Sequence, residues 1–516
     1  MEEERLEYLY CNMKTKTINT FSGGIAEDVR EARTNTFSYA SGFDTFSNSH
    51  RISPYRTMET ESVDSGTLST FGLTETVIMK DSVNTNIYAL GHSSSDNNIK
   101  FFQKATAMDI TASFQACTGG EDSTGNVIPG TLAAYNAKLY ALRTDNVNTV
   151  LVEYNHATST LAAKQDGGSG QSLNGISANV KPFVHPMDDI LYVGHSNWVS
   201  KLDGTTLTRN VLELPSEIYI TSLTSFGAYL AIATAPVNGG ISSKVYLWNR
   251  DTSVTTVTEV IDFGEGELKV LENISGTLVG VMSNKIPTTN SLFNIKTKLS
   301  LKTYAGGQPV NQKEITTTSS VFTLHSYKAK QSNKLFFACS ASLNGTALNQ
   351  IWVAGFNDAG QWFMTPDRLI NNNTALTGQI NGFSLLGDYL WAGFNDDGSF
   401  FRTRFTSATY PTATYESLTN HSMDLDDRTK KKKLHFVSVA KSSTTGQLVV
   451  SVSVDGGAYQ TVVTLASGGS LVKKEARLAT AAPFTDGYEF RFKVESTNGA
   501  EMTELKYAYE VIEKNI

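Results

Sequence analysis

Ile190-Leu191-Tyr192-Val193-Gly194 is one occurrence of a short phrase that appears seven times along the chain. Each occurrence has a polar turn, a run of apolar and aromatic residues, and then a small or polar break. The seven runs are marked by Tyr88, Tyr140, Tyr192, Tyr229, Leu278, Phe336 and Tyr389. Repeats spaced about 37 to 58 residues apart and built from strand-forming residues are typical of a β-propeller with one repeat per blade. The sequence therefore predicts an all-β chain with a six- or seven-bladed β-propeller.

Composition agrees with this prediction and excludes some function classes. The chain has 516 residues, of which 18% are charged, and it is rich in Gly, Ser, Thr and Asn. This is typical of short strands joined by many turns, and the length predicts roughly two to four domains. The net charge of −7 predicts no broad basic face for nucleic acid.

Cysteine usage and hydropathy bear on the compartment. The three cysteines, Cys11, Cys117 and Cys339, are far apart, which argues against a disulfide framework or a structural zinc site and suits a reducing cytoplasm. The acidic start, Met1-Glu2-Glu3-Glu4-Arg5, is unlike a signal peptide. No run of about 18 apolar residues occurs, so no membrane span is expected.

Three regions differ in pattern. Residues 1–60 are loop-like, with aromatic residues at intervals and neither helical nor strand periodicity, and predict an extended N-terminal arm. Residues 61–428 carry the repeats and predict the propeller. The charged run Lys430–Lys433 predicts a solvated linker or a sheet edge. Residues 429–516 contain alternating strands around the turn Asp455-Gly456-Gly457, and they predict a small antiparallel β-sandwich.

The arm has two interpretations. Its apolar side chains either pack on the surface of their own chain or contact a neighbouring subunit. The candidates for subunit contact are Phe21, Ile25, Phe37, Tyr39, Phe43, Phe46 and Tyr55.

No motif marks a catalytic, cofactor or metal site. A nucleophile elbow, an HExxH pair, a phosphate-binding loop and a dinucleotide fingerprint are all missing from the sequence. His185 and His195 flank one expected strand and are placed at its opposite ends, which does not favour shared metal binding. The Asp-Gly turns are similar to the Asp-box turns of sialidases. A sialidase also needs clustered arginines and a Tyr nucleophile with a Glu partner, and although three of the six arginines between residues 57 and 427 could converge in space, nothing in the sequence marks them. We therefore expect no catalytic residue, no cofactor and no metal.

Two stretches resemble virion proteins of tailed bacteriophages. One is Phe21–Ile25 with Phe43–Phe46 and Ser53–Arg56, and the other is Phe490–Phe492 with Glu501–Glu510. The resemblance implies a structural protein in which a propeller precedes a small sandwich. Propeller-containing tail nozzle proteins ring the DNA exit channel, usually as hexamers, although the large platform region of that family is not identifiable in this sequence.

The sequence thus predicts a non-enzymatic tail protein, nozzle or tail tip, assembled in the host cytoplasm and located in the virion tail. Its expected partners are other tail proteins and copies of itself, with DNA passing without specific binding and with a host-surface receptor as a further partner. The alternatives are a receptor- or carbohydrate-binding tail protein, a capsid decoration protein and a glycoside hydrolase. Deleting residues 1–60 is expected to abolish assembly and to leave the propeller folded.

Overall fold

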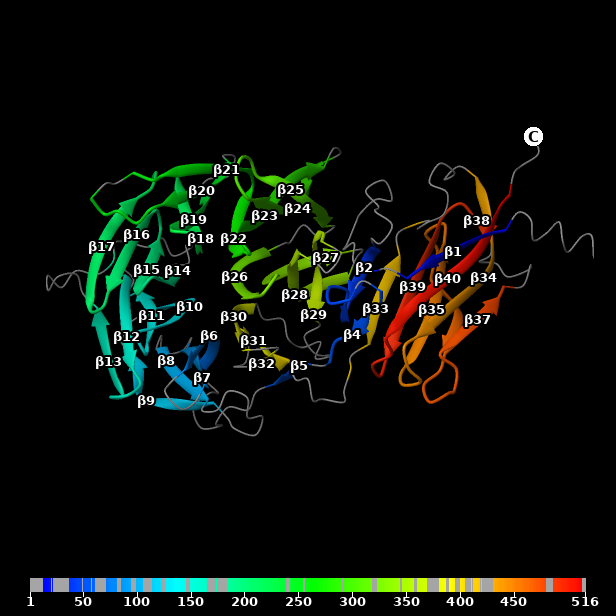
Figure 1. Cartoon of the computed structure of the whole chain (residues 1–516), viewed down its shortest axis with the longest axis horizontal. Helices are drawn as coiled ribbons and strands as arrows, with labels where there is room; N and C mark the ends of the chain where they lie inside the picture. The colour runs from blue at the N-terminus through cyan, green and yellow to red at the C-terminus, as the bar shows by residue number, and fades with distance from the viewer. Residues whose placement is uncertain are drawn as a thin grey trace, which may run out of the picture. The chain divides into compact units, whose positions relative to one another are not determined.

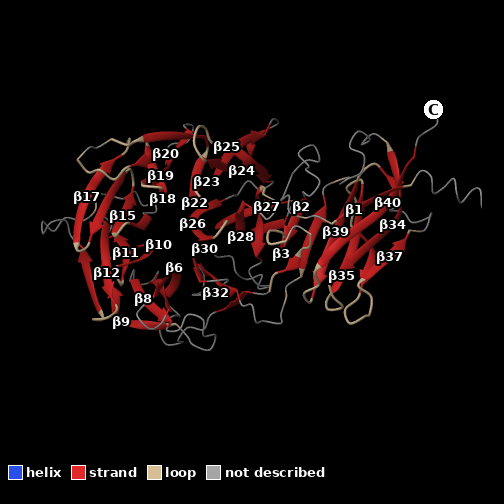
Figure 2. Cartoon of the chain, in the orientation of Figure 1, coloured by secondary structure: helices blue, strands red, loops and turns tan. Residues whose placement is uncertain are grey.

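A computed structural model shows that the chain is all-β, as predicted: its described residues form strands and no helix (Figure 2). The described residues are 13–19, 21, 37–48, 50–56, 58–60, 71–80, 85–93, 99–104, 114–122, 126–144, 149–164, 173, 183–237, 242–253, 256–288, 291–317, 323–343, 346–356, 360–368, 380–386, 389–394, 400–403, 410, 412–417, 419, 430–478 and 486–512. None of them forms an apolar helix long enough to cross a bilayer.

The chain divides into two compact units. One comprises Met1–Thr57, Gln350–Asn372 and Phe405–Ile516, and the other comprises Met58–Asn349 and Asn373–Arg404.

Seven sheets of the described residues have four strands each, and they follow one another along the chain from blue to yellow in Figure 1. The first three sheets are β6 (Phe71–Lys80), β7 (Thr85–Ser93), β8 (Ile99–Lys104) and β9 (Gln115–Asp122); β10 (Asn126–Tyr135), β11 (Lys138–Thr144), β12 (Thr149–Asn155) and β13 (Thr160–Lys164); β14 (Phe183–Met187), β15 (Ile190–His195), β16 (Trp198–Asp203) and β17 (Thr206–Glu213). The next three are β18 (Ile218–Phe226), β19 (Tyr229–Pro236), β20 (Ser242–Trp248) and β21 (Glu259–Glu265); β22 (Glu267–Ile274), β23 (Thr277–Thr288), β24 (Ser291–Tyr304) and β25 (Val310–Thr317); β26 (Thr323–Gln331), β27 (Lys334–Leu343), β28 (Thr346–Phe356) and β29 (Trp362–Arg368).

The seventh sheet takes its last strand from the N-terminal region. It consists of β30 (Ile380–Leu386), β31 (Tyr389–Phe394), β32 (Phe400–Thr403) and β5 (Met58–Thr60). Phe401 pairs with Thr60, so residues at the predicted end of the arm complete a sheet that the chain begins more than three hundred residues later.

Every recurring phrase of the sequence forms the second strand of one four-stranded sheet. The seven marker residues lie on β7, β11, β15, β19, β23, β27 and β31. A second strand has a hydrogen-bonded neighbour on each side, and both faces of β15 and β19 are almost wholly buried. Burial on both faces favours continuous apolar runs over strict alternation, which explains why these strands stand out in the sequence.

The first strands of the seven sheets form a closed series of neighbours. β6 lies next to β10, and the series continues through β14, β18, β22, β26 and β30 back to β6. Each of these strands has a sheet partner on one edge only, so its other edge must find hydrogen-bond partners elsewhere.

Aromatic side chains pack one sheet against the next. Trp248, at the end of β20, meets Tyr192 of β15 edge-on, with ring centroids 5.9 Å apart. Phe101 of β8 stacks on Tyr154 of β12 at 5.2 Å. All four side chains are buried in the core.

The unit that begins with Met1–Thr57 contains two five-stranded sheets in addition to β29 and most of β28. One joins β1 (Lys14–Ile18), β40 (Met502–Ile512), β34 (Lys431–Lys441) and β37 (Lys473–Arg477), with β38 (Asp486–Gly487) also paired to β34. The other has the order β2 (Phe37–Ser41), β33 (Ala413–Ser417), β39 (Phe490–Thr497), β35 (Gln447–Val454) and β36 (Gln460–Leu465). A short pair, β3 (Phe43–Asp44) with β4 (Ser53–Pro54), completes the described strands.

The strands of these two sheets come from all three of the regions that the sequence predicted. β1 and β2 belong to the five-stranded sheets, and β33 joins the same set before residue 428. The lysine run is an interior strand, not a linker: β34 pairs with β40 on one side and with β37 and β38 on the other. Lys432 is fully buried, and its ammonium donates to the carbonyls of Tyr488 and Lys430 at 3.1 and 3.2 Å. A lysine can occupy such a position because its stem is apolar and only its tip needs acceptors.

Gly446, just before β35, gives a test of local packing. It has a φ of +72°, and a Cβ there would lie 2.4 Å from the backbone nitrogen of Ala500. We expect Gly446→Ala to lower the free energy of unfolding by about 3 kcal/mol, since overlap adds to the strain of a positive φ. Gly468→Ala is the matched control, because Gly468 has a φ of +75° and open space around it, and should cost about 1 kcal/mol. Equal losses in thermal unfolding followed by circular dichroism would contradict the overlap.

Candidate functional site

One cluster of charged side chains links the first strands of four consecutive sheets. It contains His185 of β14, Thr224 and Ser225 of β18, Glu272 and Asn273 of β22, and Lys328 and Lys330 of β26. At its centre the ammonium of Lys328 lies 2.9 Å from a carboxylate oxygen of Glu272. Their side chains are only 19% and 14% exposed.

Lys328 also donates hydrogen bonds to the backbone of two other first strands. Its ammonium donates to the carbonyl of Leu223 on β18 at 2.9 Å and to the carbonyl of Leu271 on β22. An ammonium has three donors, so the two carbonyls and the carboxylate match its capacity. Lys328 therefore ties three first strands together.

Glu272 also accepts hydrogen bonds with its second carboxylate oxygen. Its other oxygen accepts from the Thr224 hydroxyl at 2.8 Å and from the backbone N–H of Asn273 at 3.0 Å. Burial alone would raise the pKa of Glu272, but the Lys328 ammonium and these hydrogen bonds outweigh burial and hold that pKa below its usual value. The carboxylate is thus kept ionised as one half of a cross-link.

His185 extends the cluster to a fourth strand. Its Nε2 lies 2.8 Å from the Ser225 hydroxyl, and the Ser225 carbonyl accepts from the Asn273 amide at 2.9 Å. Burial, reinforced by the Lys328 charge and opposed by Glu272, lowers the pKa of His185 to about 4. The imidazole is therefore neutral at pH 7.

This shift predicts an acid-sensitive stability. Below pH 6.5, the ordinary pKa of histidine, His185 binds a proton in the unfolded chain. In the folded chain it does not bind that proton until about pH 4. The neutral imidazole of His185 therefore makes its full contribution to the free energy of unfolding above pH 6.5. That contribution is lost as the pH falls toward 4, and the loss is about 2 kcal/mol at pH 4.5. We expect His185→Gln to flatten the fall in urea-unfolding free energy between pH 7 and pH 4.5. His50→Gln, at an exposed position, is the control; equal pH profiles for wild type and His185→Gln would refute the assignment.

A second buried carboxylate lies within the sheet β10–β13. Glu153 of β12 is 2.7 Å from the ammonium of Lys138, 2.7 Å from that of Lys164 and 2.8 Å from the Tyr140 hydroxyl. Burial and the Glu153 charge raise the pKa of Tyr140, which stays protonated and donates. Glu153, its two lysines and Tyr140 thus join neighbouring strands of one sheet, and their polar atoms are paired with one another.

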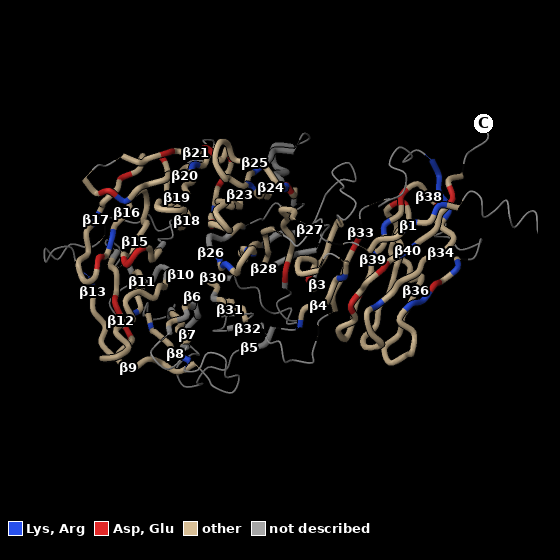
Figure 3. Tube along the Cα trace, viewed as in Figure 1, with Lys and Arg blue, Asp and Glu red and all other residues tan. Residues whose placement is uncertain are grey.

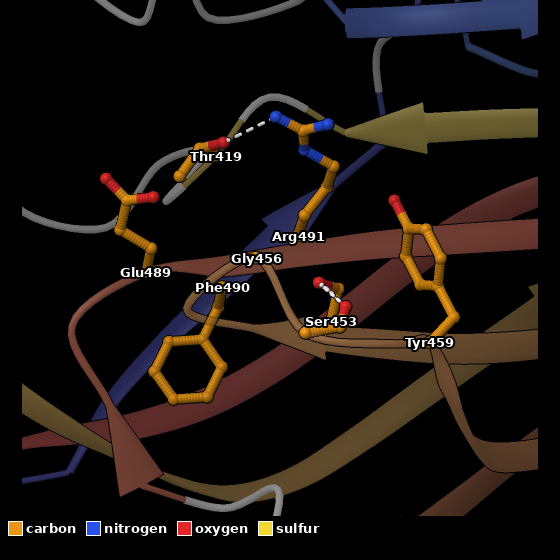
Figure 4. Close-up of a pocket in the computed structure, with 8 residues that line it drawn as sticks. Thr419, Ser453, Gly456, Tyr459, Glu489, Phe490 and Arg491 are labelled. Carbon is orange, nitrogen blue, oxygen red and sulfur yellow. Dashed lines mark hydrogen bonds between the residues drawn. The ribbon is translucent and has the colours of Figure 1, made fainter. Parts of the chain in front are cut away.

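A cavity of about 190 Å³ has a different character, because polar groups line an open space. It lies on the face of the sheet β2-β33-β39-β35-β36 that presents Arg491 (Figure 4). The lining residues are Thr419, Ser453, Gly456, Gly457, Tyr459, Glu489, Phe490 and Arg491.

Strand alternation places the key groups. Along β39 the burial alternates residue by residue, so Phe490 points into the core and Arg491 points outward. Figure 4 shows Arg491 between Glu489 on one side and Tyr459 on the other, with Phe490 directed away. The Arg491 guanidinium donates to the Thr419 hydroxyl at 3.0 Å.

Neighbouring bonds hold the rim in place. The Asp455 carboxylate accepts from the backbone N–H groups of Tyr488 and Glu489, both at 2.8 Å, and the Ser453 hydroxyl donates to the Gly457 carbonyl at 2.6 Å. The Lys493 ammonium lies 5.0 Å from the centre of the Tyr459 ring. The cavity is thus formed on a strand with two partners and beside a braced turn.

The sequence-predicted contact residues lie elsewhere in the same unit. Phe21, Phe37, Phe43 and Phe46 are buried in their own chain, and Phe21 and Phe37 both pack on Tyr415 with ring centroids 5.6 Å apart. The Tyr55 hydroxyl donates to Asp367. These contacts support the interpretation in which the arm packs on its own chain. Tyr39 is half-buried, and Ile25 lies outside the described residues.

The two histidines weighed as metal ligands serve separate hydrogen bonds. His195 Nε2 lies 2.9 Å from the Ser200 hydroxyl within its own sheet, whereas His185 belongs to the first-strand cluster. Within the described ranges, no three His, Cys, Asp or Glu side chains are grouped to hold a metal ion.

Sequence reasoning did not single out the first-strand cluster or the cavity. Glu272 and Lys328 come from different repeats, and only the fold brings them together. Arg491 had a weak signal, since it alternates with Phe490 and Phe492, but alternation alone indicates only a strand. Basic and acidic residues are interspersed among the described residues of both units (Figure 3).

Comparison with known proteins gives remote structural likenesses only. No family model and no curated protein matches the chain. Hydrazine synthase of Kuenenia stuttgartiensis is similar at 12% identity and a TM-score of 0.42, over 67% of this chain and 97% of that one. An exo-β-1,3-galactanase of Phanerochaete chrysosporium is similar at 11% identity and a TM-score of 0.31, over 88% and 99%. Neither is named as a bacteriophage protein, and such likeness carries no information about activity, so the virion assignment stays a prediction.

Proposed function

We propose that this chain is a non-enzymatic structural protein of a tailed-bacteriophage virion, a tail component that forms oligomers around the DNA exit path. In this proposal the seven four-stranded sheets are the blades of a seven-bladed β-propeller, and the two five-stranded sheets form a β-sandwich. The closed series of first strands supports the blade count, since a propeller arranges its inner strands in a ring. The protein would assemble in the host cytoplasm and reside in the tail with other tail proteins.

The observation that carries the proposal is the distribution of the N-terminal strands. β1, β2 and β5 enter three different sheets and pair with β40, β33 and β32. Glu501 fixes the same segment, because it accepts from Arg51, Ser53 and Ser442 at 3.3, 3.0 and 2.6 Å. Sheets completed in this way resist local opening, a property suited to a part of a particle that must keep its shape.

The charged clusters support the same conclusion. Glu272 with Lys328, and Glu153 with its lysines, direct their charges at one another and at backbone carbonyls. Charged groups engaged in this way stabilise strands, whereas a catalytic acid or base needs to face a substrate.

The second candidate function is binding of a receptor or carbohydrate at a tail tip. The cavity beside Arg491 favours it, since its polar groups line an open space. Capsid decoration and glycoside hydrolysis are the remaining alternatives, and no contact among the described residues favours either.

The test is the mass and negative-stain shape of the purified full chain. A ring of about six or twelve copies with an open channel would support the tail conduit. A monomer or trimer would contradict it and favour the receptor-binding candidate, and binding to purified capsids but not to tails would favour decoration. Deleting residues 1–60 cannot serve as the assembly test, because that deletion removes β1, β2 and β5.

A further inference from the structure

We propose that the cavity beside Arg491 is a binding site for one neutral sugar residue. This inference is independent of the virion role, since it concerns the chemistry of a single face of one sheet.

The charges of the cavity favour a neutral ligand over an anion. Among its lining residues Arg491 is the one cation and Glu489 the one anion, so their formal charges cancel. A phosphate or carboxylate placed against Arg491 would face the Glu489 carboxylate across the same space. A sugar has hydroxyl groups that both donate and accept, and it can use the two charged groups together.

The hydrogen-bonding capacity also suits hydroxyl groups. A guanidinium has five N–H donors in a fixed plane, more than its bonds to Thr419 and Tyr459 use. The exposed Glu489 carboxylate offers acceptors on one side of Arg491. Adjacent ring hydroxyls can therefore accept from Arg491 and donate to Glu489, an arrangement that fixes the orientation of a ring.

The size and the rigidity of the cavity favour a single small ring as its ligand. A volume of about 190 Å³ is smaller than the roughly 300–1,000 Å³ of pockets for drug-sized ligands, so one small ring is the natural occupant. Gly456 and Gly457 leave the mouth free of side chains, and Tyr459 supplies an aromatic wall held by Lys493. A site on a paired strand is already formed before the ligand arrives, which reduces the ordering cost of binding.

Saturation-transfer difference NMR on the full chain tests the proposal. The probes are the methyl glycosides of glucose, galactose, mannose and N-acetylglucosamine, with acetate and methyl phosphate as anion probes. We expect transfer to at least one glycoside, with a dissociation constant on the order of 1 mM, and none to the anions.

Variants locate the binding. Arg491→Ala and Glu489→Gln should each weaken the glycoside at least about tenfold, by the loss of one charged hydrogen bond. Glu489 is exposed, so its substitution leaves the fold intact even if Arg491→Ala does not fold. Glu475→Gln, on β37 of the other sheet, should change nothing.

Three results would overturn the proposal. They are a blank across all four glycosides, transfer that survives unchanged in Glu489→Gln, and transfer to the anions alone. The last would identify an anion site instead.

Discussion

Replacing Lys328 by methionine lowers the free energy of unfolding by about 3 to 5 kcal/mol in our expectation, the range for a buried ion pair that loses one partner. The variant keeps the apolar stem but leaves the Glu272 carboxylate without its cation and the carbonyl of Leu223 without this donor. The Glu272 carboxylate would then be buried without the Lys328 ammonium, and burying an uncompensated charge accounts for most of the lost stability. Urea unfolding followed by tryptophan fluorescence measures it, since all five tryptophans lie between Trp198 and Trp391.

Two further variants separate the ion pair from simple loss of a lysine. Lys330→Met removes a 42% exposed lysine on the same strand, 4.0 Å from Glu272, and should cost about 1 kcal/mol or less. Adding Glu272→Gln to Lys328→Met should recover part of the loss, because no unpaired charge is left buried. If Lys328→Met costs no more than Lys330→Met, the cross-link is not a significant source of stability.

Replacing Phe37 by alanine should destabilise the five-stranded sheets by about 3 to 5 kcal/mol, as for other buried aromatic side chains. Phe37 is fully buried and packs on Tyr415, which also receives Phe21. The strands of the two five-stranded sheets contain no tryptophan, so hydrogen exchange of β33 and β39 is the appropriate measurement.

Tyr39 supplies the matched control on the same strand. It is half-buried, and Tyr39→Ala should cost less than half as much. The loss in Phe37→Ala should also be independent of protein concentration, because the contact lies within one chain. A loss that disappears on dilution, or one that is larger for Tyr39, would instead place Phe37 at a subunit interface.

The second strands could be predicted from the sequence, and the first strands could not. A second strand such as β15 is buried on both faces, so its apolar run is visible without knowledge of its partners. A first strand has one unpaired edge and carries polar groups such as Glu272 and Lys328, whose partners come from other repeats. No local pattern records a contact of that kind.

The N-terminal region shows the same limit more strongly. β2 has five residues, and β3 and β4 have two each, too few for a recognisable period. The sequence indicated its aromatic side chains but not their destination, because Tyr415 lies far along the chain. The candidate cavity was equally hidden, since Thr419, Tyr459 and Arg491 meet only after three separate segments have paired.

The long-range pairing of the N-terminal strands has a consequence for biosynthesis. Lys14 pairs with Tyr509 and Phe37 with Ser417, so β1 and β2 leave the ribosome hundreds of residues before their partners. At about 5 to 20 residues per second, this interval lasts on the order of tens of seconds. During it β1, β2 and β5 are exposed strand edges, and a ribosome that stalls before β32 releases a chain in which none of them can pair. Interrupted synthesis should therefore yield aggregates, and the emergence of β40 should be the step that allows β1 to reach its folded position.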